Sequence, residues 1–357
     1  MKKYKVVIII LSVILVGAFL LGFLYTYSIS AVSKKSVPVV VEIKEKSTVY
    51  MVGDILYENG LIRNKLAYKI YVKLNHINNL QASTYELNKN MKLKEIIKVL
   101  EDGNSYNPNQ ISITFKEGLN IRKIAKVIEE ETNNTYDDFI NTVNNKEFIN
   151  ELINEYWFLT DNITNSKIYY PLEGYLFPDT YAFSNKDVEV KEIIKKMLDE
   201  MDKKITPYKE QIESSKYNIH EILTLASIVE LEGAAADDRK GVAGGFYNRL
   251  KDGWALGSDV TTYYYLKIDD FKISLNGNKN LYTCDNAYNT RCQSFTGLPV
   301  GPISNPGLVS IEATINYKAH DYYYFVADCD GKTYLNKNST GHYNTINKLK
   351  AENKWCV

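Results

Sequence analysis

The stretch "IHEILTLASIVELEG", Ile219 to Gly233, decides how the last part of the chain folds. Its apolar residues recur every three or four positions, at Ile222, Leu225, Ala226 and Val229. This spacing predicts an amphipathic helix from about Ile219 to Glu232, with one apolar stripe that faces a core. Gly233 follows the last periodic residue and is a typical end of a helix.

Glu230 is a charged residue that borders this apolar stripe. It lies one position past Val229 and one helical turn after Ala226. A carboxyl group beside apolar neighbours loses hydration and holds its proton more tightly, which suits a general acid at neutral pH. The alternative is an ordinary solvated carboxylate at a helix edge. Glu232 lies about 200° further round and cannot share a pocket with Glu230 while the helix continues.

A second amphipathic helix is predicted for "DDRKGVAGGFYNRLKDG", residues 237–253, with an Asp as its cap and Gly253 as its end. Gly244 and Gly245 in its interior each cost about 1 kcal/mol relative to Ala, so they predict close packing against another backbone. The stretch "ALGSDVTTYYY" (255–265) follows and reads as a loop. Its hydroxyl groups suit either the lining of a sugar cleft or a hydrogen-bonded turn.

The first half of the chain alternates strands and helices. Strands are predicted at 37–43, 80–87 and 111–118, and helices at 47–62, 65–74, 92–103 and 120–131. The polar stretch 101–110 is a candidate boundary, and we expect a first folded unit over about 37–118. Residues 119–215 are expected to form a helical and loop-rich connecting part, and 216–357 a third unit. The fold class is therefore α+β.

The N-terminal run from Val6 to Tyr27 carries no charge. As a helix it would span roughly 30 Å of hydrocarbon. It predicts a single transmembrane helix over 6–27 with residues 1–5 as a cytoplasmic tail, because three lysines of that tail precede it. A cleaved signal peptide is the alternative, although its apolar region is usually shorter. No second run of this length follows, which places the rest of the chain on one side of the membrane.

Composition argues against nucleic acid as a partner. The chain has 357 residues, and its 43 basic residues are balanced by 43 acidic ones. Nucleic-acid binding usually demands a basic excess, which is missing here. Tyr is abundant at 29 copies. Exposed Tyr suits a surface that packs on sugar rings, and drift in composition is the alternative.

The cysteines lie in the last quarter of the chain, at Cys284, Cys292, Cys329 and Cys356. They form no CxxC pair and the His residues are scattered, so a zinc site is not expected. An even number in one region fits two disulfides in an oxidising compartment. Three pairings remain open, of which Cys284–Cys292 with Cys329–Cys356 closes the fewest residues. Buried free thiols are the alternative.

The sequence contains no motif that is typical of nucleophilic catalysis. GxSxG and SxxK are missing, and no glycine-rich phosphate loop opens a helix after a strand. Carboxylate acid–base chemistry remains. Besides Glu230, the other carboxylate considered for catalysis is Glu173, at the start of "EGYLFPDTY". That residue lies in a proline-containing stretch, 169–183, which is expected to be an ordered loop with short extended pieces, and a bracing role is preferred for it.

Six segments follow one another in a fixed order behind the N-terminal span: "EGYLFPDTY" (173–181), "LASIVELE" (225–232), "VAGGFYNRL" (242–250), "LGSDVTTYY" (256–264), "YNTRCQSFTGLPVGPISNPG" (288–307) and "YYFVAD" (323–328). In this order they resemble the YceG-like (MltG) family of endolytic murein transglycosylases, over about residues 38–345. The sequence departs from the family pattern at four places, by having Gly257 for Gln, Val260 for Pro, Gly233 for Thr, and no His around Thr333. The Cys284/Cys292 insertion is also outside the pattern.

The resemblance implies a LysM-like subdomain at 37–118 and a mixed α/β catalytic domain that cuts peptidoglycan glycan strands from within. The catalytic glutamate of the family falls on Glu230. Cleavage would occur between N-acetylmuramic acid and N-acetylglucosamine without added water, leaving a 1,6-anhydro end. The substrate contacts expected are Ser258, Asp259, Thr261, Tyr288, Asn289 and Glu173.

The partners implied are nascent peptidoglycan, the membrane and cell-wall synthesis enzymes, and the chemistry requires no metal or cofactor. Two alternatives remain open. One is a glycan-binding scaffold that keeps the fold without turnover. The other is a hydrolytic muramidase that uses Glu230 together with Glu173 or Asp259, because hydrolysis needs two carboxylates.

Overall fold

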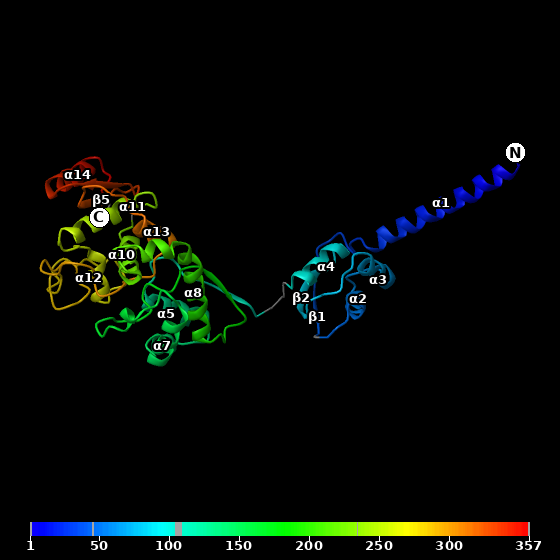
Figure 1. Ribbon diagram of the computed structural model, residues 1–357, viewed down its shortest axis with the longest axis horizontal. Coiled ribbons are helices and arrows are strands. Elements are labelled where there is room, and N and C mark those ends of the chain that lie inside the picture. The colour runs from blue at the N-terminus through cyan, green and yellow to red at the C-terminus, as the bar shows by residue number, and fades with distance from the viewer. Residues whose placement is uncertain (1, 45, 104–108, 234, 356–357) are drawn as a thin grey trace. The chain divides into compact units, whose positions relative to one another are not determined.

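The computed structural model describes residues 2–44, 46–103, 109–233 and 235–355. The chain divides into two compact units, Met1–Asn109 and Gln110–Val357 (Figure 1). The division falls within the polar stretch 101–110. The parts expected at 119–215 and 216–357 both belong to the second compact unit, and their separation stays a prediction.

The first element of the N-terminal unit is α1 (Lys2–Ser28). Its segment Leu11–Ser28 is long and apolar enough to cross a bilayer, by length and composition. The apolar side chains from Leu11 to Tyr27 are largely exposed in the protein alone. Such exposure fits a helix whose surroundings are hydrocarbon, and equally a signal sequence.

The rest of this unit has the order strand, helix, helix, strand, helix. The elements are β1 (Pro38–Ile43), α2 (Val49–Glu58), α3 (Lys65–Leu74), β2 (Ser83–Asn88) and α4 (Leu93–Asp102). The two strands pair antiparallel, with Pro38 opposite Asn88 and Ile43 opposite Ser83. The strands and helices predicted in this region are confirmed, although their ends differ by a few residues.

The C-terminal unit is mainly helical. It begins with β3 (Ile111–Thr114), α5 (Ile121–Glu131), α6 (Tyr136–Val143), α7 (Lys146–Glu155), η1 (Asp161–Thr164), β4 (Thr180–Phe183), α8 (Val190–Ile205), η2 (Thr206–Tyr208) and α9 (Lys209–Glu213). It continues with α10 (Ile219–Leu231), α11 (Arg239–Lys251), α12 (Asp259–Tyr265), α13 (Leu308–Ile315), β5 (Tyr324–Ala327), β6 (Thr333–Asn336) and α14 (Ser339–Ala351). Two antiparallel pairs, β3 with β4 and β5 with β6, complete it.

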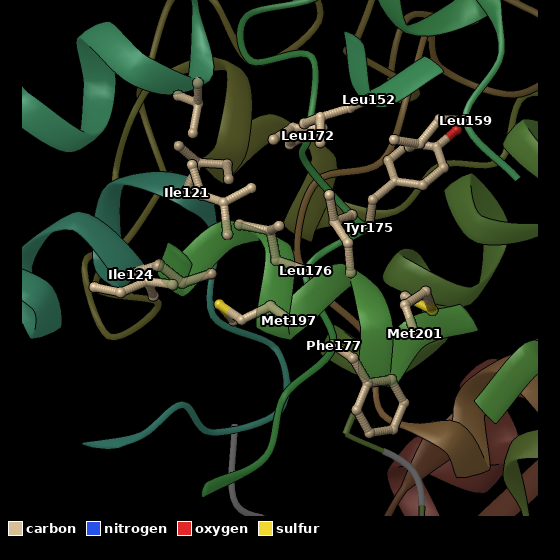
Figure 2. Close-up of a cluster of buried hydrophobic side chains, with 14 of the residues drawn as sticks. Ile121, Ile124, Leu152, Leu159, Leu172, Tyr175, Leu176, Phe177, Met197 and Met201 are labelled. Carbon is tan, nitrogen blue, oxygen red and sulfur yellow. The ribbon is translucent and has the colours of Figure 1, made fainter. Parts of the chain in front are cut away.

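The main core of this unit joins residues from β3 to α13. Figure 2 shows part of it, with Ile121 and Ile124 of α5 and Met197 and Met201 of α8 among the labelled side chains. Leu176, labelled in the same view, is fully buried. The expected connecting part and the start of α10 therefore share one hydrophobic core.

The central helix is α10, which packs on both α11 and α13. Every residue from Ile222 to Glu230 is buried. Leu223 belongs to the main core, whereas Leu225 and Val229 belong to a second cluster with α11 and α12. The prediction of a single apolar stripe is therefore wrong, because this helix is covered on all sides. Its predicted bounds are confirmed.

Two further expectations have clear outcomes. Residues 255–265 were expected to be a loop, but Asp259–Tyr265 form helix α12, since Thr261, Thr262 and Tyr264 find a buried environment. The disulfide between Cys284 and Cys292 is confirmed. Cys329 is also disulfide-bonded, and Cys356 lies outside the described residues.

Candidate active site

Helix α10 carries Glu230 into the interior. Its start is fixed by a capping box, in which the Asn218 side chain accepts from the Glu221 N–H at 3.0 Å and the Glu221 carboxylate accepts from the Asn218 N–H at 2.9 Å. Glu230 follows three turns later, in the last turn of the helix, and only 8% of its surface is exposed. The carboxyl group is therefore partly dehydrated, as the sequence predicted, and the alternative of a solvated edge carboxylate does not fit this burial.

Two donors meet one oxygen of this carboxyl group. Arg239 Nη1 donates to Glu230 Oε2 at 3.1 Å, and the backbone N–H of Gly307 donates to the same oxygen at 3.0 Å. Arg239 is the first residue of α11, and its Nη1 also donates to Ser310 Oγ of α13 at 2.8 Å. Three helices thus meet at Glu230, and both donors stabilise a negative charge on Oε2.

The loop that delivers Gly307 is attached to α10 one turn before Glu230. The Ile303 N–H donates to Ser227 Oγ at 3.0 Å, and Ser304 Oγ donates to the Ser227 carbonyl at 3.1 Å. Ser227 is fully buried, and its hydroxyl also donates to the Thr224 carbonyl. Ser227 therefore works as an anchor for this loop.

Asn305 ties the same loop to two other segments. Its Oδ1 accepts from the N–H groups of Gly174 at 3.0 Å and Leu176 at 2.9 Å. Its own N–H donates to the Leu119 carbonyl at 2.8 Å, and its carbonyl accepts from the Gly118 N–H at 2.9 Å. The turn after β3, the segment after Glu173 and the Gly307 loop are consequently held in register by one buried amide.

Glu173 lies in this bracing network, with 1% of its surface exposed. It accepts from the Ile121 N–H at 3.1 Å, from Tyr264 Oη at 3.0 Å and from Asn305 Nδ2 at 3.2 Å. Burial raises the pKa of Glu173 to about 8. Because its oxygens are occupied and enclosed, the geometry favours the bracing role over a catalytic one.

A second carboxyl group lies beside Glu230, and it belongs to Glu117 in the turn after β3. Gly118 next to it has a left-handed φ of +76°, and a Cβ at that position would lie 3.6 Å from Glu230 Cγ. Loss of hydration and the nearby charge of Glu230 raise the pKa of Glu117, while Arg239 opposes them. Glu117 is exposed as a residue, so this carboxyl stands at the solvent edge of the site.

The predicted contacts at the start of α12 form a group of their own. Ser258 Oγ donates to Glu232 Oε1, and the Ser258 N–H donates to Thr290 Oγ1 at 3.1 Å. Asp259 is paired with Arg291, and its side chain is 58% exposed. Thr261 is fully buried and donates to the Ser258 carbonyl at 2.8 Å. Ser258 thus connects this group to the end of α10, two residues beyond Glu230.

Tyr288 and Asn289 are buried beneath that group. Tyr288 Oη accepts from the Tyr169 N–H at 3.4 Å, and its ring contacts Tyr264 at a centroid distance of 4.9 Å. Asn289 donates to the Leu281 and Thr283 carbonyls and accepts from Thr262 Oγ1. These side chains brace the 280–290 loop. Their direct contact with a glycan stays a prediction, as does that of Ser258, Asp259 and Thr261.

Cleavage of a glycan strand requires a groove beside Glu230, and this groove is a prediction. One hollow of about 400 Å³ is lined by Tyr217, Tyr247 and Tyr317, and also by Ile222 of α10. Glu230 lies eight residues further along the same helix, which is about 12 Å. This hollow is therefore separate from the Glu230 carboxyl.

Sequence reasoning missed Glu117, Arg239 and Gly307. Each had a local signal: a Glu-Gly pair between a strand and a helix, an Arg at a helix start, and a glycine in an Asn-Pro-Gly turn. None of these signals indicates which distant residue it will meet.

The chain matches known proteins over most of its length. Residues 41–348 match the model of the YceG-like family. The chain is 35% identical to an endolytic murein transglycosylase of Bacillus subtilis (strain 168), over 91% of this chain and 88% of that protein. It is 34% identical to an endolytic murein transglycosylase of Streptococcus pneumoniae (strain D39), covering 88% of this chain but only 58% of that longer protein.

Among solved structures, a yceG-like protein from Listeria monocytogenes is 34% identical and superimposes with a TM-score of 0.61. That match covers 87% of this chain and all of the Listeria chain. Sequence, family model and structure agree over most of the length. The chain therefore belongs to the YceG-like family.

Proposed function

We propose that this chain is a peptidoglycan lytic transglycosylase whose catalytic acid–base residue is Glu230. Its relatives in Bacillus subtilis and Streptococcus pneumoniae are named endolytic murein transglycosylases. The observation that carries the assignment is the buried Glu230 carboxyl at the junction of α10, α11 and α13, held by Arg239 and the Gly307 N–H. The substrate is the glycan strand, cut between N-acetylmuramic acid and N-acetylglucosamine.

The chemistry uses one carboxyl group twice. Glu230 gives its proton to the glycosidic oxygen as the C1–O bond breaks, and then takes a proton from the C6 hydroxyl of the same sugar as O6 attacks C1. The product is a 1,6-anhydro end, and no water is consumed. Arg239 and Gly307 stabilise the carboxylate that remains after the first step, where preorganised donors are most effective.

Two alternative functions were considered for the same fold. A hydrolytic muramidase would need a second carboxylate, but Glu173 is enclosed and Asp259 is paired with Arg291. These contacts weigh against both proposed pairs. A glycan-binding scaffold without turnover is the remaining alternative, motivated by the Gly233 and Gly257 departures.

Product masses after digestion of purified glycan strands separate these activities. We expect internal cuts and new anhydro ends from the wild type, and no cleavage by Glu230→Gln, which should keep its fold and its affinity for glycan. Glu130→Gln, an exposed glutamate of α5, is the matched control and should cleave normally. Reducing ends heavier by one water would support the hydrolase. Full activity of Glu230→Gln would remove it from the mechanism.

The N-terminal unit suggests how the enzyme meets its substrate. We propose that α1 anchors the chain in the cell membrane as a single span, with the catalytic part outside the cytoplasm near nascent peptidoglycan and the cell-wall synthesis enzymes. We further propose that the strand–helix–helix–strand unit is LysM-like and holds glycan. Co-sedimentation with phospholipid vesicles should require residues 1–33, and binding of the full-length Glu230→Gln protein to glycan should weaken when the surface of this unit is altered.

A further inference from the structure

Glu117 and Glu230 are brought together by a turn whose position is fixed by backbone contacts. The Phe115 N–H donates to the Asp179 carbonyl at 3.0 Å, and the Gly118 N–H to the Asn305 carbonyl at 2.9 Å. The Phe115 ring is buried in the main core. The backbone that carries the Glu117 carboxyl is therefore held on both sides.

Gly307 lies between the two carboxyl groups. Its N–H donates to Glu230 Oε2 at 3.0 Å, while a Cβ on Gly307 would overlap the carboxyl of Glu117. The φ of Gly307 is −74°, which any residue adopts, so a side chain at this position would meet the Glu117 carboxyl and no backbone constraint. Two carboxyl groups thus flank a single residue without a side chain.

The charges around the pair do not balance when both carboxyl groups are ionised. The charged groups that act on Glu117 are Glu230 of α10 and Arg239 of α11. From α13 comes the neutral hydroxyl of Ser310, and Lys116, on the same turn as Glu117, is exposed. Two negative charges against one guanidinium favour retention of one proton by the pair.

We propose that Glu117 is a positioning residue for the catalytic proton: its carboxyl beside Glu230 keeps one proton on the pair at neutral pH. Glu230 then has a proton to give to the glycosidic oxygen, and the C6 hydroxyl proton returns to the pair when O6 closes on C1, so no proton is gained or lost per cycle. The inference rests on the proposed transglycosylase activity. It also explains how Glu230 works as an acid although Arg239 and Gly307 stabilise its ionised form.

The test is the pH profile of kcat for anhydro-end formation by the full-length protein. Glu117→Gln keeps the size of the side chain and removes its charge, which leaves Arg239 as the charged neighbour of Glu230. We expect kcat at pH 7 to fall about tenfold or more, and the optimum to move to lower pH by about one unit or more, so that acidification restores activity. Glu117→Asp, which retains the charge, should keep an optimum close to that of the wild type.

Controls separate this inference from the proposed function. Glu130→Gln should have the wild-type profile, and Glu230→Gln should be inactive at every pH. An unchanged profile for Glu117→Gln, with anhydro ends still formed by the wild type, overturns the inference alone. Absence of anhydro ends from the wild type overturns the proposed function instead. If Glu117→Gln fails to unfold cooperatively, Glu117→Ala removes the same charge and takes its place in the comparison.

Discussion

Helix α11 contains two adjacent glycines that the structure treats very differently. A Cβ on Gly244 would overlap the carbonyl oxygen of Lys318 and lie 2.9 Å from His320 Nε2. A Cβ on Gly245 would lie 3.8 Å from the Tyr322 carbonyl oxygen, which is an ordinary contact. The close packing that the sequence predicted for these glycines is therefore confirmed at Gly244 and is not required at Gly245.

These contacts determine how much Ala at each position changes the stability of the fold. Replacing Gly by Ala in a helix interior is favourable by about 1 kcal/mol when there is room for the methyl group. Gly245→Ala should therefore be as stable as the wild type or more stable. At Gly244 the obstacle is backbone, so α11 or the 318–320 segment has to move, and overpacking of this kind costs about 3 kcal/mol or more. The two variants should differ by roughly 3 kcal/mol.

Thermal unfolding measures this difference directly. For a unit of this size, 1 kcal/mol corresponds to about 2–4 °C, so the two midpoints should differ by roughly 6–12 °C. Because Arg239 begins the same helix, Gly244→Ala should also lose more cleavage activity than Gly245→Ala below the unfolding transition. Equal midpoints for the two variants would refute the packing of α11 described here.

Three further predictions concern single contacts. Arg239→Gln should reduce kcat about 10²-fold, because the carboxylate formed on Glu230 loses its neighbouring cation. Lys240→Gln, at the exposed neighbouring position, should leave kcat unchanged. The rate of product formation, followed by mass spectrometry, checks both. Glu173 has a pKa raised to about 8 in the folded state, so its contribution to stability is full below about pH 4.5 and is lost as pH rises to about 8. Glu173→Gln should therefore reduce the difference in urea-unfolding free energy between pH 5 and pH 8 by on the order of 3 kcal/mol, and an unchanged difference would contradict the assignment. Replacing both Cys284 and Cys292 by Ser should lower the free energy of unfolding by only about 2–3 kcal/mol, because the disulfide closes a short loop. Added reductant should lower the unfolding free energy of the wild type toward that of the variant.

Local pattern was sufficient for the helices and strands of the N-terminal unit and for β3, α5, α10 and α11. The helices at 65–74 and 92–103 have strong apolar periodicity, and their bounds, like those of the helix at 219–232, were predicted within a few residues. Helix α12 was missed because its hydroxyl-rich sequence favours a turn, and only burial of Thr261 and Tyr264 against other elements stabilises it as a helix. The prediction of a single apolar stripe on α10 also failed because of tertiary packing. Other elements cover this helix on every side, so it has no polar face that would define a stripe.

The sequence by itself determined that a carboxyl group, Glu230, is placed within an apolar helix, and that glycines and cysteines constrain the chain around it. Tertiary structure alone decided what faces that carboxyl. Arg239 is nine positions away in the chain and Gly307 seventy-seven, and Glu117 comes from a turn before α5. Helix and strand periodicity reports only the few residues on either side of a position, whereas the charges that hold and release a proton act through space between segments that packing brings together.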